Sequence, residues 1–411
     1  MGCAMAEHVA IIGAGQAGAA LAEKLRASGL NGPITLFGDE AFEPYQRPPL
    51  SKKYLSGEWP EERLALRSPT HWASKQIELV TAAPVVAVDI QSKTLTVGKT
   101  LMPWTKLVFA TGAAPRPLPP EFIGRTNVHE LRGLDDAIRL KAAMQPRQRM
   151  LVIGGGYIGL ETAAVAVKLG LEVTVVERAS RILERVACGR TAAILRDVHR
   201  HNGVHILEGR TVQSVMGADR ITQVTLDDGQ VIETDVILVG IGVVPRTSLA
   251  QQAGIACDDG ILVDEFGRTS AEQVWAAGDC TRFPFRGERL RLESVPHAIE
   301  QAECVADDII GQSRPYKPIP WFWSDQYDLK LQMVGLTGGF DAYIERPSDK
   351  GQSLWYFRHG RLIGAVAIND SSAFMAAKKM LTNATTPSLA EASEKTFDPI
   401  QWMKKASHKA A

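Results

Sequence analysis

Cysteine is scarce in this sequence and never occurs in closely spaced pairs. The 411 residues contain only five cysteines, which are Cys3, Cys188, Cys257, Cys280 and Cys304. No C-x-x-C or C-x4-C spacing occurs, which argues against a redox dithiol and against a zinc ribbon. So few and so dispersed cysteines are typical of a reducing compartment, and we expect a cytoplasmic protein.

Long apolar runs and net charge are also missing. A helix that crosses a bilayer needs about 18 apolar residues, whereas the best run, residues 9–22, is shorter and includes Gln16 and three glycines. The 46 Lys and Arg residues balance the 46 Asp and Glu residues. Neither a nucleic acid nor a membrane surface is therefore expected as a partner. The length suits two or three globular domains.

Glycine, by contrast, is abundant, with 36 residues, and is clustered in two similar turns. The apolar run 8–12 leads into the first turn, Gly13-x-Gly15-x-x-Gly18. Residues 19–27 have helix-forming composition, and a second apolar run, 34–37, is followed by Asp39. This order predicts a strand, a turn, a helix and a second strand with an acidic residue at its end.

The same unit recurs in the middle of the chain. Residues 150–153 form an apolar run before Gly154-x-Gly156-x-x-Gly159, residues 160–169 favour a helix, and residues 173–176 lead into Glu177. One polypeptide is thus predicted to hold two nucleotide-binding half-sites, and this duplication makes a purely structural role for the glycines improbable.

Each turn makes specific physical demands. Its first glycine permits the sharp bend, its second leaves room for a pyrophosphate, and its third lets helix and strand pack closely. The helix N-terminus then offers free N–H groups to the phosphates. Two such sites without a thiol pair suggest a tightly bound FAD at the N-terminal turn and an exchanging NADH at the second. Glu177 favours NADH because a carboxylate repels a 2′-phosphate, while Arg178 keeps NADPH open.

Later runs complete the predicted organisation. The run 274–276 ends at Gly278-Asp279, an acid suited to a flavin ribitol, and proline-rich stretches at 115–120 and 315–320 mark boundaries. Beyond them, residues 330–334, 354–357 and 361–366 predict antiparallel strands, and residues 371–382 predict a helix. We predict an α/β fold with two Rossmann-like nucleotide-binding domains and a small C-terminal α/β domain. The expected limits are 1–115 with 245–320 for FAD, 116–244 for NAD, and 321–411.

Several longer strings are far more specific than the glycine turns. They are PYQRPPLSK (44–52), ATGAAPR (110–116), GGGYIGLE (154–161), AAGDC (276–280), ESVP (293–296) and PWFWSDQ (320–326). Through these strings the chain resembles, over nearly its whole length, the FAD-dependent, NADH-linked ferredoxin reductases that serve bacterial Rieske oxygenases and cytochromes P450. The resemblance implies a glutathione-reductase-like architecture.

The resemblance also implies site residues. It places FAD contacts at Ala17, Asp39, Lys52, Val85, Arg132, Asp279 and Val295, with Arg47 and Arg116 as further matched cofactor positions, and NADH contacts at Gly156, Glu177 and Arg185. The remaining cofactor candidates are the turn glycines Gly13, Gly15, Gly18, Gly154 and Gly159, with Tyr157, Gly242 and Trp323. Tyr157 is expected where the nicotinamide enters, although a surface tyrosine is an alternative, and Trp323 has core packing as its alternative.

Lys52 and Glu161 resemble the family's ion pair beside the flavin and are the predicted catalytic residues. A cation there stabilises an anionic reduced flavin, and a paired carboxylate holds the cation in place. A solvated loop lysine and a helix-start carboxylate are the alternatives. The His199, His201 and His205 cluster does not share one helical face, so no metal site is expected.

The activity implied is electron transfer from NADH through FAD to a [2Fe–2S] ferredoxin that feeds a Rieske dioxygenase or a P450. Rubredoxin reductase and monodehydroascorbate reductase are enzyme alternatives on the same fold. A redox-regulated flavoprotein binding module and a flavin-free nucleotide-binding scaffold are alternatives from other functional classes. An acidic ferredoxin would dock on basic residues, for which the candidates are Arg67, Lys330, Lys378 and Lys379. A monomer is expected.

Overall fold

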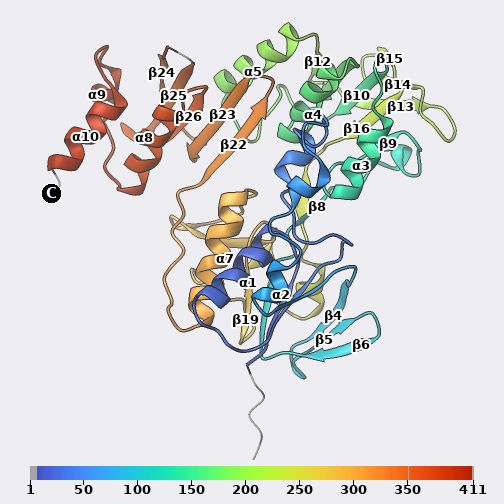
Figure 1. Ribbon diagram of the computed structural model, residues 1–411. Coiled ribbons are helices and arrows are strands. Elements are labelled where there is room, and N and C mark those ends of the chain that lie inside the picture. The colour runs from blue at the N-terminus through green and yellow to red at the C-terminus, as the bar shows by residue number, and fades with distance from the viewer. Residues whose placement is uncertain (1–6, 350, 410–411) are drawn as a thin grey trace, which may run out of the picture. The chain divides into compact units, whose positions relative to one another are not determined.

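The computed structural model describes residues 7–349 and 351–409, which divide into two compact units (Figure 1). Unit 1 contains the chain up to Gln46, Glu61–Ala114 and Val243–Pro318. Unit 2 contains Arg47–Pro60, Pro115–Gly242 and the chain from Ile319 onward. Cys3 lies outside the described residues. Among the described residues, no helix combines the length and the apolar character needed to cross a membrane.

A five-stranded parallel sheet forms the centre of unit 1. Its strand order is β19-β7-β1-β2-β3, with bounds Val274–Ala276, Lys106–Phe109, Val9–Ile12, Ile34–Phe37 and Ile77–Val80. All residues of β1 and β2 are buried. Such strands are covered on both faces, which is why their sequences are apolar except for the hydrogen-bonded Thr35.

Two helices lie side by side against one face of this sheet, α1 (Gln16–Ala27) and α7 (Val295–Ile309) (Figure 1). Leu21 and Leu25 of α1 and Val305 of α7 pack with Val9 and Ile11 of β1. The other face is covered by a second core that includes Phe37, Phe109 and Phe283. Smaller sheets complete unit 1: β4-β5-β6 (Val85–Asp89, Thr94–Val97, Thr100–Pro103), β18-β20-β21 (Ile261–Leu262, Thr281–Phe285, Glu288–Leu290) and the pair β17-β8 (Val243–Pro245, Ala113–Pro115).

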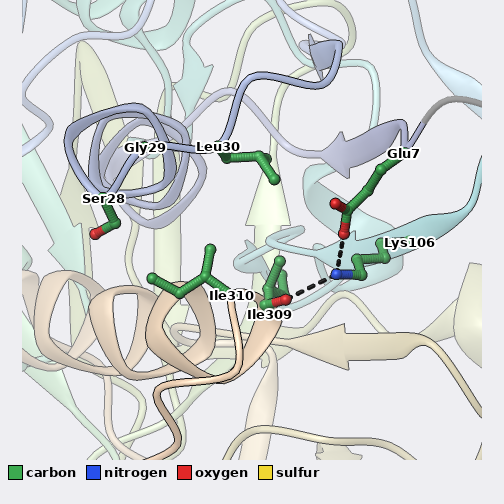
Figure 2. Close-up of a pocket in the computed structure, with 7 residues that line it drawn as sticks. All are labelled: Glu7, Ser28, Gly29, Leu30, Lys106, Ile309 and Ile310. Carbon is green, nitrogen blue, oxygen red and sulfur yellow. Dashed lines mark hydrogen bonds and ion pairs between the residues drawn. The ribbon is translucent and has the colours of Figure 1, made fainter.

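A cavity of about 370 Å³ lies where α1 and α7 end (Figure 2). Its lining includes Ser28 and Leu30 after α1, and Ile310 after α7. The Lys106 ammonium pairs with the Glu7 carboxylate and donates to the carbonyl oxygen of Ile309 at 2.7 Å. These contacts give the Lys106 charge a partner and connect the start of β7 to the end of α7.

Unit 2 contains a second five-stranded parallel sheet. Its order is β12-β11-β10-β16-β9, with bounds His205–Glu208, Glu172–Glu177, Arg149–Ile153, Val236–Val239 and Val128–His129. The helices associated with this part of unit 2 are α3 (Leu134–Ala143), α4 (Tyr157–Lys168) and α5 (Gly189–His201), and a small antiparallel sheet, β13-β14-β15, spans Val212–Met216, Gln223–Leu226 and Val231–Glu233.

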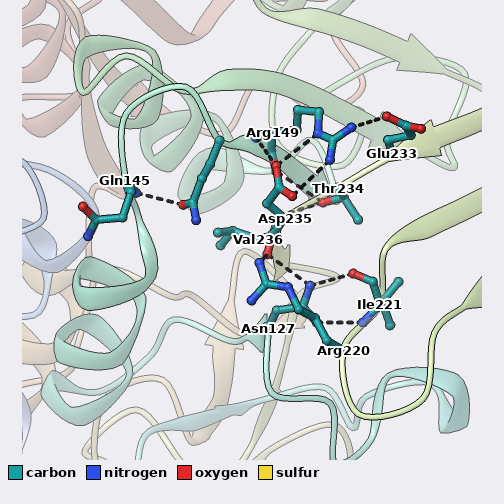
Figure 3. A network of polar contacts seen from close by, with 10 residues as sticks. Asn127, Gln145, Arg149, Arg220, Ile221, Glu233, Thr234, Asp235 and Val236 are labelled. Carbon is teal, nitrogen blue, oxygen red and sulfur yellow. Dashed lines mark hydrogen bonds and ion pairs between the residues drawn. The ribbon is translucent and has the colours of Figure 1, made fainter.

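Polar contacts fix the beginnings of the strands in this sheet (Figure 3). The Arg149 backbone N–H and side chain both donate to the Asp235 carboxylate, at 2.9 and 3.0 Å. The buried Asn127 amide donates to the carbonyl oxygens of Ile221 and Asp235, at 2.8 and 3.1 Å. This network holds the amino ends of β10 and β16. The second glycine turn follows the opposite, carboxyl end of β10.

The C-terminal part of unit 2 is an antiparallel sheet with helices beside it. The order is β22-β23-β26-β25-β24, with bounds Trp321–Gln326, Leu329–Gly335, Arg361–Ile368, Gln352–Arg358 and Ala342–Pro347. Helices α8 (Ser371–Thr382), α9 (Leu389–Ser393) and α10 (Pro399–Lys409) follow. Trp355, Phe357 and Phe374 lie in its core. The α/β class, with two parallel sheets and a small C-terminal α/β part, is as predicted.

Candidate functional site

The first glycine turn connects β1 to α1 and places one open glycine between two crowded ones. A Cβ atom on Gly13 would lie 2.2 Å from the Ala110 carbonyl oxygen, and one on Gly18 would lie 2.0 Å from that of Gly13. Gly15, the N-cap of α1, has no atom within 4 Å of its Cβ position. The turn is therefore closed toward the sheet and open in front of the α1 N–H groups, and this geometry fits a pyrophosphate.

Other predicted FAD contacts in unit 1 gather near this turn. A Cβ atom on Gly278 would lie 3.1 Å from that of Ala17, so the Gly278-Asp279 turn after β19 lies beside the start of α1. The Ala83 N–H donates to the Gly38 carbonyl oxygen at 2.8 Å, which brings the segment before Val85 to the end of β2. Val295 is the first residue of α7.

Asp39 is exposed just after β2 and forms an ion pair there. Its carboxylate pairs with Arg246 at 2.5 Å, and the Arg246 backbone N–H donates to Gly112 at 2.9 Å. Sequence reasoning missed Arg246, which lies 207 positions away with no motif around it. His297 lies at the start of α7 and is 2% exposed, and burial lowers its pKa to about 4, so the ring is neutral.

The second glycine turn repeats the geometry of the first in unit 2. A Cβ atom on Gly154 would lie 2.3 Å from the Gly240 carbonyl oxygen, and one on Gly159 would lie 2.3 Å from that of Gly154. Gly156, the N-cap of α4, has no atom within 4 Å of its Cβ position. This cradle also fits a dinucleotide pyrophosphate.

Glu177 ends β11 and faces the second turn. Its carboxylate accepts hydrogen bonds from the backbone N–H groups of Gly155 and Ala179, both at 2.7 Å. These bonds fix the carboxylate in the position where the Rossmann pattern binds a ribose. Across the turn, a Cβ atom on Gly242 would lie 3.3 Å from the Arg185 guanidinium and 3.4 Å from that of Arg116. The structure thus brings Gly242, Arg116 and Arg185 together, and two guanidinium groups suit a phosphate.

Lys52 and Glu161 form a buried ion pair within unit 2. The Lys52 Nζ lies 2.7 Å from Glu161 Oε2, and the two side chains are 14% and 3% exposed. Glu161 lies on α4, and Lys52 follows the 3₁₀ turn Pro48–Ser51. A carboxylate so deeply buried must be paired and hydrogen-bonded. Nearby in the chain, the Arg47 guanidinium donates to the Arg132 carbonyl oxygen at 2.9 Å.

Two serines that sequence reasoning did not single out complete this pair. Ser51 donates to Glu161 Oε2 at 2.5 Å, and Ser324 of β22 donates to Oε1 at 2.6 Å. Both serines lie inside strings that carry the family resemblance, PYQRPPLSK and PWFWSDQ. Attention to hydroxyl groups within those strings would have found them.

The two predicted aromatic contacts are both partly buried in unit 2. The Tyr157 ring centroid lies 4.7 Å from that of Phe322, and its hydroxyl lies 3.0 Å from the sulfur of Met333. Burial raises the pKa of the Tyr157 phenol. Trp323 pairs with Trp321 at 5.7 Å on β22. These contacts agree with packing, and a role of either ring at a cofactor remains a prediction.

Comparison with known proteins gives consistent matches along the chain. The family described as pyridine nucleotide-disulphide oxidoreductase matches residues 7–302, and the family described as reductase C-terminal matches residues 321–401. The chain is 41% identical to the rhodocoxin reductase of Rhodococcus erythropolis over 396 residues, which covers 95% of this chain and 93% of the relative.

Two solved structures are similar over nearly the whole chain. The first is a covalent putidaredoxin reductase–putidaredoxin complex, with a TM-score of 0.94, 35% identity, and coverage of 98% and 99% of the two chains. The second is the ferredoxin reductase for the CYP199A2 system from Rhodopseudomonas palustris, with a TM-score of 0.93, 37% identity, and coverage of 97% and 99%.

Proposed function

Because this chain belongs to the pyridine nucleotide-disulphide oxidoreductase family, we propose that it carries electrons from NADH through FAD to a [2Fe–2S] ferredoxin that serves an oxygenase. One observation carries the proposal: a single chain holds two crowded-open-crowded glycine turns, at Gly15 and at Gly156, each at the start of a helix. Similarity to a putidaredoxin reductase, a rhodocoxin reductase and a ferredoxin reductase supports the choice of partner.

The residues have distinct parts in this reaction. Bound FAD supplies the conversion between the electron pair of a nicotinamide and the single electrons of an iron–sulfur carrier. The chain contributes binding and electrostatics: Gly15 and Gly156 admit phosphates, and Glu177 accepts from a free 2′-hydroxyl and so favours NADH. Lys52 provides a cation whose charge Glu161 holds in place, which suits a cofactor that becomes negative on reduction.

The domain limits and the compartment belong to the same proposal. Residues 1–115 with 245–320 are proposed to bind FAD, residues 116–244 NADH, and residues 321–411 to form the C-terminal domain. A cytoplasmic location is supported by the small number of cysteines. The four cysteines among the described residues are free thiols.

Acceptor preference tests the function directly. The purified, FAD-loaded protein is given NADH with a [2Fe–2S] ferredoxin, a rubredoxin or monodehydroascorbate at matched concentrations. We expect the highest kcat/KM with the ferredoxin. A higher kcat/KM with the rubredoxin or with monodehydroascorbate would make that acceptor the proposed substrate instead of the ferredoxin. Failure of NADH to bleach the flavin would overturn the reductase function.

A further inference from the structure

A continuous line of buried polar side chains extends from Glu161 into the C-terminal sheet, all within unit 2. Ser324 donates to Glu161, Gln326 Nε2 donates to Ser324 at 3.0 Å, and Gln326 Oε1 lies 2.7 Å from His199 Nε2. The Tyr327 hydroxyl lies 3.1 Å from His199 Nδ1. Ser324, Gln326 and His199 are at most 2% exposed, so these bonds are not exchanged for water.

The charge of Glu161 gives every hydrogen bond in this line one direction. An ionised carboxylate only accepts hydrogen bonds, so the Ser324 hydroxyl must donate its single proton to Glu161. Ser324 must then accept from the next group, which requires the NH₂ of Gln326 to face it. The amide oxygen of Gln326 consequently faces His199, and that oxygen also only accepts.

The direction set at Glu161 therefore fixes the tautomer of a distant histidine. His199 must donate from Nε2, so a neutral ring leaves Nδ1 as an acceptor for the Tyr327 hydroxyl. Burial lowers the pKa of His199, which agrees with a neutral ring. His199 lies on α5 and Gln326 on β22, so the line connects two elements that are 127 positions apart.

The backbone at Tyr327 places its hydroxyl at the end of this line. Tyr327 lies in the turn between β22 and β23 and has φ of +55°. A residue other than glycine rarely adopts this conformation, and it persists where surrounding contacts hold it. The Tyr327 ring packs edge-on against His199, with centroids 5.1 Å apart.

We propose that His199 and Gln326 are positioning residues, which hold the Ser324 proton on Glu161 and thereby fix the Lys52 ammonium for flavin reduction. With Ser324 on Oε1, Oε2 is left to Lys52 and Ser51. The catalytic part of this inference rests on the proposed function. The hydrogen-bond direction does not, because it follows from the donors and acceptors alone.

Gln326→Glu tests the direction with little change in volume. The introduced carboxyl faces His199 and Tyr327 and reaches Glu161 and Lys52 through Ser324. When protonated, it has one donor and one acceptor and preserves the direction. When ionised, it only accepts and draws the Ser324 proton away from Glu161. Burial raises the pKa of a carboxyl, so both forms are accessible near neutral pH.

The rate of flavin reduction by NADH reports the outcome. For Gln326→Glu we expect a rate near that of the unmodified protein at low pH and about tenfold lower at high pH, with KM for NADH unchanged. Asp325→Asn, an exposed neighbour on the same strand, is the matched control and should keep the normal pH profile. A ratio of variant to unmodified rates that does not change with pH would overturn the positioning role.

The tautomer of His199 can be measured by NMR, independently of any activity assay. In ¹⁵N-histidine-labelled, FAD-loaded protein, nitrogen–proton correlation spectra should show His199 entirely protonated at Nε2, with the signal identified by its loss in His199→Asn. Tyr327→Phe should keep the Nε2–H tautomer, because the Gln326 amide oxygen still only accepts. An Nδ1–H tautomer in the unmodified protein would overturn the hydrogen-bond direction, even if the protein reduces ferredoxin. An Nε2–H tautomer in a protein that does not reduce ferredoxin would overturn the proposed function and leave the hydrogen-bond direction standing.

Discussion

Glu161 is a buried charge whose lost hydration is replaced by three donors. Ser51, Ser324 and the Lys52 ammonium all lie within 2.7 Å of its two oxygens. Removing one partner of a buried ion pair costs more than removing both, because the remaining charge is left without compensation. Stability and catalysis can thus be separated by comparing single and double variants.

Lys52→Met is expected to lower the free energy of unfolding by about 3 kcal/mol and to slow flavin reduction by NADH by about 100-fold. The double variant Lys52→Met with Glu161→Leu removes both charges and should recover most of the stability but none of the rate. Urea denaturation measures the first quantity and rapid-mixing absorbance the second. Recovery of the rate in the double variant would leave the pair with a structural role only.

Glu177→Arg is expected to raise KM for NADH by about tenfold and to lower KM for NADPH, because the charge facing the 2′ position is reversed. Glu172→Arg is the matched control, since Glu172 is exposed at the other end of the same strand. Steady-state kinetics with both nucleotides measure the change. An unaltered preference in Glu177→Arg would show that this carboxylate does not contact the ribose.

Individual residues could be predicted where the chemistry is local in sequence. Gly15, Gly156 and Glu177 follow from spacing alone. The partners of Glu161 could not be predicted in this way, because Ser51 is 110 positions away and Ser324 is 163 positions away. Arg246, which pairs with Asp39, likewise has only the fold to bring it there.

Secondary-structure elements were predictable where burial is complete or the turn chemistry is strong. The predicted strand 34–37 coincides with β2, and the predicted helix 371–382 coincides with α8. Strands such as β4 and β22 were not predicted, and their burial is irregular, because exposed or half-buried residues lie within the apolar part of each strand.

The two types of glycine in the second turn should respond differently to alanine. Gly156→Ala places a methyl group in open space, so we expect unchanged stability and a KM for NADH about tenfold higher. Gly154→Ala places a methyl group 2.3 Å from the Gly240 carbonyl oxygen, at a residue whose φ is +109°. We therefore expect the free energy of unfolding to fall by about 3 kcal/mol. Urea midpoints and NADH kinetics distinguish the two. A stable Gly154→Ala protein would contradict the crowded geometry.

Asp308 couples α7 to the central sheet of unit 1 through its charge. Its carboxylate accepts from Arg268 at 2.5 Å and from the Trp275 indole at 2.8 Å. Burial disfavours the charged form, but hydrogen bonds from Arg268, Ser313 and Trp275 outweigh it and lower the pKa of Asp308. A lowered pKa in the folded state contributes stability that is present above the unfolded value, about 3.9, and is lost as the pH falls through the folded value.

Asp308→Asn should therefore cost about 2 kcal/mol near neutral pH and much less once the pH falls below the lowered pKa of Asp308 in the folded state. Urea denaturation at several pH values measures this convergence. Asp258→Asn, which removes an exposed carboxylate that pairs with Arg282 in the same unit, is the control and should change stability little at any pH. A pH-independent cost for Asp308→Asn would assign the loss to packing rather than charge.

At the scale of the whole molecule, zero net charge means that any attraction for an acidic partner must be local. Of the predicted docking residues, Arg67 pairs with Glu23 at 2.5 Å, which reduces its availability. Lys330 and Lys379 are exposed on the C-terminal part of unit 2, and the Lys378 ammonium lies 4.1 Å from the Trp321 ring centroid. These lysines are the better candidates.

Salt should separate docking from flavin chemistry, because screening weakens attraction between exposed charges. We expect kcat/KM for the ferredoxin to fall as salt rises, while reduction of a small neutral acceptor stays nearly constant. The double variant Lys330→Gln with Lys379→Gln should lower kcat/KM for the ferredoxin by about tenfold at low salt and flatten its salt dependence. Lys93→Gln with Lys99→Gln removes two exposed charges from unit 1 and should do neither. Equal effects of the two double variants would mean that the chain's overall charge, rather than this surface, guides the acceptor.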